Sequence, residues 1–120
     1  MKHLSIALAG AAMIIASGLA QSADLAAGKA VWEKVNYASC HGADGKSPVD
    51  PAYPILAGQH ADFLAHALKA YQRGAAGAAP TANVRKNAIM GAFATQLSVA
   101  DIANVSAWLA AQPGPLAVRK

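Results

Sequence analysis

The sequence predicts an all-α domain built from short helices that are joined by long loops. Three segments place apolar residues at helical spacing, and each begins or ends at a recognisable capping signal. No segment alternates apolar and polar residues with the period of two that a half-buried strand requires. A proline-rich stretch without periodicity separates the first two predicted helices. This ratio of loop to helix is unusual for a helical bundle.

The first 20 residues have the composition of a secretory signal peptide. Lys2 gives a positive start, an apolar run covers residues 4–16, and small residues follow that run. Cleavage is expected after Ala20, with Ala23 as the alternative. A membrane anchor is the competing interpretation, but the apolar run is shorter than a membrane-spanning helix needs. We therefore expect an exported, periplasmic protein that has no stable membrane insertion once the signal is removed.

The composition argues for a bound cofactor and against nucleic-acid binding. A mature chain of roughly 100 residues is marginal by core burial alone, so such a domain often depends on a disulfide, metal or cofactor. The chain has 1 cysteine, Cys40, which excludes an intrachain disulfide. Its formal net charge of +4 is a mild bias toward acidic partners and is too small to indicate nucleic-acid binding.

The first helix is predicted from about Leu25 to Val35, with Asp24 as its N-cap. Gly28 falls on its apolar face. A glycine inside a helix costs about 1 kcal/mol relative to alanine. Two interpretations stay open: a tolerated imperfection, or a close crossing by another helix, because glycine removes the side chain between two backbones.

An irregular segment is expected next, over residues 47–58. Pro48, Pro51 and Pro54 each remove a backbone donor and disfavour a helix at the preceding residue. A dozen residues without regular structure inside a compact domain usually wrap or bind something.

The second helix is predicted from Ala61 to Arg73, with Gly74 as its C-cap. A loop rich in Gly and Ala follows over residues 74–82. The basic pair Arg85–Lys86 then faces either an acidic group or solvent.

The last helix has the clearest pattern. Ser98 and Asp101 have the spacing of a capping box, with Asp in place of the usual Glu or Gln. Pro113 stops the helix. The apolar residues between them at helical spacing are Ile102, Val105, Trp108 and Leu109.

The strongest chemical signal is the hexapeptide Tyr37-Ala38-Ser39-Cys40-His41-Gly42. It differs by one residue from Cys-x-x-Cys-His, in which two thiols add to the vinyl groups of haem and the His ligates its iron. Tyr37 occupies the first Cys position, while Cys40 and His41 occupy the second Cys and the ligand positions. Taken alone, Cys40 also fits a small buried residue or a thiol that pairs between chains.

Met90 is the candidate for a second iron ligand. We expect it in a glycine-containing loop ahead of the last helix. A methionine in such a loop is not in the position of a typical core residue. Met1 and Met13 lie in the predicted signal. A His/Met pair closes both axial positions of a haem iron, which favours electron transfer over catalysis. His60 and His66 could also ligate iron through their imidazole rings. Both fall at or on the polar side of the second predicted helix, so they are interpreted as solvated surface residues.

Together these segments resemble a small bacterial class I cytochrome c of the exported, single-haem kind. The resemblance covers nearly all of residues 24–112 and rests on the order and spacing of its pieces. It implies an all-α class I cytochrome c fold, wrapped around one haem c over residues 24–112, and a tail over residues 113–120. The matching pieces are Ala27-Gly28-Lys29, Ser39 to Gly45, Pro54 to Gln59, Met90-Gly91-Ala92 with Leu97-Ser98, and Asp101-Ile102-Ala103 with Trp108-Leu109.

The resemblance also implies a role for each matching residue. Cys40 would form a thioether to one haem vinyl group, His41 would be the proximal iron ligand, and Met90 would be the distal ligand. The carbonyl of Pro54 would accept a hydrogen bond from the His41 ring and fix its orientation. Gly28 would mark the crossing of the first and last helices. The protein would carry one electron between periplasmic or membrane redox proteins that dock transiently at the haem edge.

Tyr37 is the departure from the family pattern, because family members attach haem through two cysteines. This chain can form at most one thioether, through Cys40, and with haem bound Tyr37 is expected near a vinyl group and to swing outward. Two rival functions therefore stay open. One is a haem-free relative that acts as an interaction module. The other is a haem enzyme or sensor, in which weakened attachment opens the distal side.

Overall fold

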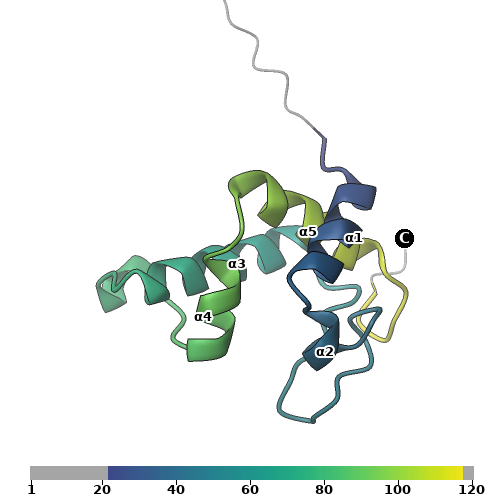
Figure 1. The fold of residues 1–120 in the computed structure, drawn as a ribbon, viewed down its shortest axis with the longest axis horizontal. Coiled ribbons are helices and arrows are strands. Elements are labelled where there is room, and N and C mark those ends of the chain that lie inside the picture. Colours follow the sequence, from purple (N-terminus) through teal and green to yellow (C-terminus); the bar gives the residue numbers. More distant parts are fainter. Residues whose placement is uncertain (1–21, 118–120) are drawn as a thin grey trace, which may run out of the picture.

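A computed structural model describes residues 22–117 and contains only helices and loops within that range (Figure 1). The predicted all-α class is confirmed. The predicted signal peptide, residues 1–20, lies outside the described residues, as do the last three residues of the predicted tail. The elements are α1 (Leu25–Lys34), α2 (Ala38–His41), α3 (Ala61–Ala75), the 3-10 helix η1 (Pro80–Ala82), α4 (Ala88–Ala94) and α5 (Val99–Ala111).

The first and last helices cross at Gly28, as predicted. A Cβ atom at this position would overlap the backbone carbonyl of Asn104 and the side chain of Trp108, both on α5. The Asn104 side chain also accepts a 2.9 Å hydrogen bond from the backbone N–H of Asp24. Glycine is therefore required here because the two helix backbones are in direct contact.

Both predicted N-caps are present. The carboxylate of Asp24 accepts a 3.0 Å hydrogen bond from the backbone N–H of Ala27. Ser98 and Asp101 exchange hydrogen bonds of 2.9 and 3.0 Å between side chain and backbone, which completes the capping box. Each cap satisfies backbone donors that a helix start leaves without partners.

The predicted end of α3 was wrong. Gly74 lies inside the helix, which continues to Ala75. The residue with a left-handed backbone is Gly77, at φ +75°. Gly74 is needed for packing instead, because a Cβ atom there would overlap the backbone of Arg85, whose N–H donates a 3.0 Å hydrogen bond to the Ala70 carbonyl. This glycine thus fixes the path of the returning loop.

The predicted loop around Met90 was also wrong, because Met90 lies in α4. The side chain of Asn87 caps this helix and accepts a 2.9 Å hydrogen bond from the backbone N–H of Met90. Gly91 is a buried helical residue, and a Cβ atom there would lie 3.4 Å from the Cβ of Ala75 on α3. The glycine therefore marks a helix contact and not a loop.

The proline-rich segment over residues 47–58 has no helix, as predicted. Backbone hydrogen bonds nevertheless fix both of its ends. The carbonyl of Gly45 accepts hydrogen bonds from Leu56 and Ala57 at 2.8 and 3.1 Å. The N–H of Gly58 donates a 2.9 Å hydrogen bond to the carbonyl of Leu109 on α5. The segment is thus held against the last helix.

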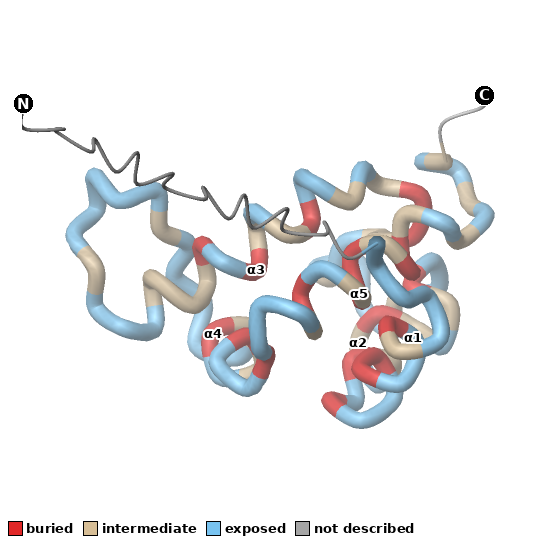
Figure 2. Tube along the Cα trace, turned by 90° about the horizontal axis from the view of Figure 1, so that it is seen from above, coloured by how far each residue is buried: buried red, intermediate tan, exposed pale blue. Residues whose placement is uncertain are grey.

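Buried residues lie on α1, α3 and α5, and α5 packs against each of the other two helices (Figure 2). Trp32, Ile102 and Val105 are each 1% exposed and form the centre of this core. Within residues 22–117, no one helix has the length and hydropathy to cross a membrane, and α4 and α5 reach those limits only when joined across a bend of 113°.

Candidate functional site

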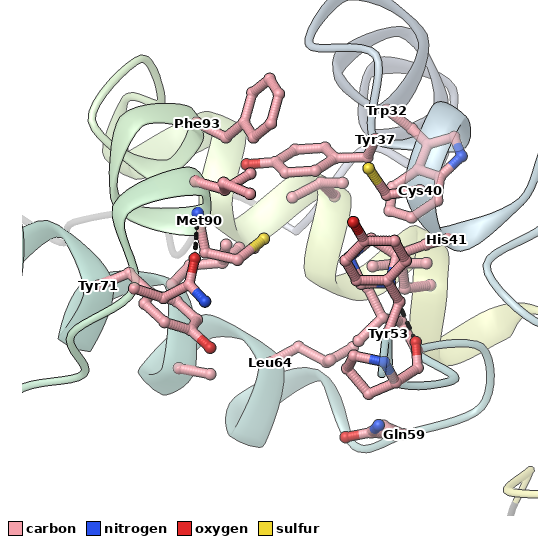
Figure 3. Close-up of a pocket in the computed structure, with 18 of the residues that line it drawn as sticks. Trp32, Tyr37, Cys40, His41, Tyr53, Gln59, Leu64, Tyr71, Met90 and Phe93 are labelled. Carbon is pink, nitrogen blue, oxygen red and sulfur yellow. Dashed lines mark hydrogen bonds between the residues drawn. The ribbon is translucent and has the colours of Figure 1, made fainter. Parts of the chain in front are cut away.

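One cavity of about 390 Å³ opens between the helices, and the predicted site residues line it (Figure 3). Cavities of this size are typical of small-molecule and cofactor sites. Its walls are mainly apolar and aromatic. The cavity lining includes Trp32, Tyr37, Cys40, His41, Tyr53, Pro54, Phe63, Tyr71, Arg85, Ile89, Met90 and Phe93.

His41 is the last residue of the one-turn helix α2, and its side chain is buried at 3% exposure. Its Nδ1 lies 3.0 Å from the carbonyl oxygen of Pro54 (Figure 3). A carbonyl can only accept a hydrogen bond, so Nδ1 carries the proton and Nε2 keeps a free lone pair. Burial lowers the pKa of His41 below its usual 6.5, against an opposing effect of the Pro54 hydrogen bond. The ring is therefore neutral at physiological pH, with Nε2 able to bind a metal.

Cys40 precedes His41 and also lines the cavity. Its thiol is free and partly buried, with the hydroxyl of Ser39 at 3.8 Å. Because α2 places consecutive residues around one turn, the thiol and the imidazole reach the same cavity from one short helix.

Met90 enters the cavity from the opposite wall. Its side chain is partly buried, and its sulfur points toward the space in front of His41 (Figure 3). Helix α4, which carries Met90, packs against α3. The two predicted ligands therefore face one another across a single space, although they are far apart in the sequence.

Tyr37 is buried at 4% exposure, and its ring lies across one edge of the cavity (Figure 3). The ring stacks on Trp32 with a centroid distance of 5.4 Å and approaches Phe93 at 5.6 Å. Its hydroxyl has no hydrogen-bond partner among the described residues. Burial without such a partner raises the pKa of Tyr37 to about 12.

Sequence reasoning missed two groups of cavity residues. Phe93 lies one turn after Met90 and contacts Tyr37, but it had no assigned role. The guanidinium of Arg85 lies 5.5 and 5.7 Å from the ring centroids of Phe63 and Tyr71 at the cavity wall. Asn87, three residues before Met90, is a capping signal that would have predicted α4.

The chemistry of the two facing ligands suits iron in a larger cofactor. A neutral imidazole nitrogen and a thioether sulfur bind transition metals of intermediate softness. Among residues 22–117, no three His, Cys, Asp or Glu side chains cluster as a metal cage would require.

Comparisons with known proteins agree with this arrangement. The sequence profile of the Cytochrome c family matches residues 25–112. Cytochrome c-554(548) of Halomonas halodenitrificans (strain ATCC 12084 / NCIMB 8669) is 38% identical over 77 residues, which cover 62% of this chain and 81% of that protein. Cytochrome c4 of Azotobacter vinelandii is 37% identical over 70 residues, which cover 58% of this chain and 31% of that protein.

Two further matches extend to a longer relative and to a solved structure. A thiosulfate dehydrogenase electron acceptor from Stutzerimonas stutzeri (strain A1501) is 34% identical over 119 residues, 96% of this chain but 51% of that protein. The crystal structure of reduced recombinant cytochrome c4 from Pseudomonas stutzeri matches with a TM-score of 0.66 and 30% identity, over 78% of this chain and 47% of that one. The chain thus spans about half, or less, of these longer relatives. The profile match and the shared architecture establish that the chain belongs to the cytochrome c family and has the class I cytochrome c fold.

Proposed function

We propose that this protein is a periplasmic electron carrier in which one c-type haem is ligated by His41 and Met90 and attached through Cys40. The observation that carries the proposal is the placement of His41 and Met90 on opposite walls of one apolar cavity (Figure 3). A bound haem supplies an iron that is reversibly oxidised and reduced by one electron.

The cavity residues fit a haem. The hydrogen bond between His41 Nδ1 and Pro54 leaves Nε2 free to ligate iron, with the ring orientation already fixed. The apolar lining suits a porphyrin ring, and Cys40 lies beside the proximal ligand, where a thioether would form. One thiol allows one thioether, so Tyr37 makes the attachment single.

The ligand pair favours electron transfer over catalysis. Two protein ligands close both axial positions and leave no open site for a substrate. The thioether of Met90 is a soft ligand that favours the reduced iron, which raises the reduction potential. The rival enzyme or sensor requires that Met90 leave the iron.

The organisation of the chain supports export and transient docking. We assign residues 1–20 as the signal peptide, residues 24–112 as the haem domain and residues 113–120 as a tail. Phe63 and Ile89 line the cavity yet are 52% and 55% exposed. Together with the basic pair Arg85–Lys86 they offer a small, partly charged docking surface for a redox partner. The name of one relative, an electron acceptor of thiosulfate dehydrogenase, illustrates such a partnership.

A pyridine haemochrome spectrum of acid-acetone-extracted protein tests the proposal. Haem retained after extraction, with an α band shifted to the red of the two-thioether form, is the expected result. Loss of haem on extraction would contradict covalent attachment, and the spectrum recorded before extraction would then separate a loosely held haem from none. A helical protein without any haem absorption would favour the interaction module. Carbon monoxide binding to the resting protein would favour the enzyme or sensor.

A further inference from the structure

Tyr37 forms the middle of an aromatic stack that spans the cavity edge. On one side its ring lies on Trp32 of α1, at a centroid distance of 5.4 Å and an interplanar angle of 28°. On the other side it meets Phe93 of α4 at 5.6 Å and 54°. Figure 3 shows the ring reaching from the Cys40 side of the cavity toward the Met90 side. The stack therefore joins the two walls that carry the proposed iron ligands.

The helix that carries Met90 is otherwise attached to α3. Its packing partner is α3, and Gln72 on α3 donates 2.9 Å hydrogen bonds to the carbonyls of Ala94 and Leu97 at the end of α4. These contacts fix α4 on α3, and α5 in turn connects α3 to α1. A direct contact from α4 to Tyr37, the residue that begins α2, is made by the Phe93 ring. Phe93 is one turn from Met90, so whatever holds the Phe93 ring also holds the thioether beside it.

We propose that Tyr37 is a positioning residue: its ring, packed between Trp32 and Phe93, holds the Met90 helix at a fixed distance from His41. The inference rests on the proposed function, because Met90 and His41 are there the iron ligands. In a chain with two attachment cysteines, the residue at position 37 would be the first cysteine and would bond covalently to haem. In this chain the Tyr37 ring instead packs across the cavity edge and links the wall that carries His41 to the wall that carries Met90.

The ring and the hydroxyl of Tyr37 make separable contributions. Aromatic pairs in this geometry add stability beyond the area that they bury. The hydroxyl, in contrast, is buried without a partner, so its removal loses no hydrogen bond among the described residues. Tyr37→Phe should therefore preserve the positioning, whereas Tyr37→Ala should abolish it.

The test is a double-mutant cycle on the purified full-length protein. The variants are Tyr37→Phe, Tyr37→Ala, Phe93→Ala and the double alanine variant, with Val99→Ala as the control, because Val99 is 76% exposed and does not line the cavity. The readout is the imidazole concentration that removes the sulfur-to-iron charge-transfer band of the oxidised protein. We expect each stack alanine to lower this concentration roughly tenfold, and the double variant to lower it no further. Tyr37→Phe and Val99→Ala should match the parent.

Additive effects of the two alanines, or an unchanged band in Tyr37→Ala, would overturn the proposal. If an alanine variant does not fold, Tyr37→Leu and Phe93→Leu keep most of the volume and replace it in the cycle. If none of the proteins contains haem, the proposed function fails and the same cycle is measured by thermal unfolding. Coupling between positions 37 and 93 would then still support the stack as the link between the walls, and its absence would overturn it.

Discussion

The two walls of the cavity are built in different ways. The His41 wall consists of α1, α2 and the proline-rich segment, and its parts are fixed by backbone contacts and by the hydrogen bond from His41 to Pro54. The Met90 wall consists of α3 and the seven-residue helix α4, which lies apart from α1 and α2 (Figure 1). Polar geometry fixes the imidazole, while the thioether depends on the packing of a short helix. We infer that the distal ligand is the one more easily displaced.

The largest expected effect comes from removing the two proposed iron ligands separately. His41→Ala should lower the haem content of the purified protein roughly tenfold or more, because the proposed proximal ligand is lost. Met90→Ala should retain haem and bind carbon monoxide, because only the distal position is opened. Haem content and the carbon monoxide difference spectrum measure both effects, with the exposed His66→Ala as the control. Equal haem loss in both variants would contradict the asymmetry.

The next largest effects are expected from one glycine on each wall, Gly28 on α1 and Gly91 on α4. Gly28→Ala should destabilise the protein by about 3 kcal/mol, because the new Cβ overlaps the Asn104 carbonyl. Gly91→Ala should be neutral or stabilising by up to about 1 kcal/mol, because its Cβ meets Ala75 at an ordinary 3.4 Å and alanine favours a helix. Denaturant unfolding compares the two variants with the parent. A tolerated Gly28→Ala would show that the first wall is not rigid at the crossing.

Tyr37, which joins the walls, predicts a response to alkali. Its pKa is raised from 10.0 to about 12, so the folded protein holds the phenol proton in a range where the unfolded chain loses it. The resulting stability is complete below pH 10 and is lost as the pH rises through about 12. The loss should reach about 3 kcal/mol. Tyr37→Phe has no phenol to titrate, so the parent should lose more stability than the variant between pH 10 and about pH 12. Parallel alkaline unfolding curves would contradict the burial of this phenol.

The smallest effect concerns α5, which packs on both walls. Two hydrogen bonds from Ser98 lower the pKa of Asp101 below its usual 3.8. The larger effect comes from the Ser98 backbone N–H and the smaller one from its hydroxyl. The stability from this carboxylate is present above that value and is lost as the pH falls through the folded-state pKa. Asp101→Asn should therefore differ from the parent at neutral pH and converge with it in acid. At neutral pH Ser98→Ala should cost about 1 kcal/mol through loss of the cap. Thermal unfolding at several pH values tests both variants.

The elements that were predicted correctly are those with local signals. The Asp24 cap and the Ser98–Asp101 box act within one helical turn, so the sequence alone locates α1 and α5. The adjacency of Cys40 and His41 is likewise local. The contact between Pro54 and His41 was expected from the family resemblance and not from any local pattern.

The features that were missed depend on partners far along the chain. A glycine commonly ends a helix, but Gly74 lies inside α3, where the close approach of the Arg85 backbone requires a residue without a Cβ atom. Met90 was expected in a loop because Gly91 was interpreted as a loop residue. The local cap at Asn87 marks the helix, whereas the contact of Gly91 with α3 is not visible in the sequence. At Gly74 a tertiary contact overrides the local preference.

The crossing at Gly28 also has a consequence for when the domain acquires its structure. Asp24 and Asn104 are 80 positions apart, so their contact closes a loop that includes every residue lining the cavity except Val105 and Leu109. Forming such a loop costs more chain entropy than forming a local turn, and contacts of long sequence separation slow folding. Because α5 follows every other described helix in the sequence, the cavity walls cannot be locked together until this helix has been synthesised. A chain that lacks α5 therefore also lacks the crossing contact that holds α1 in place.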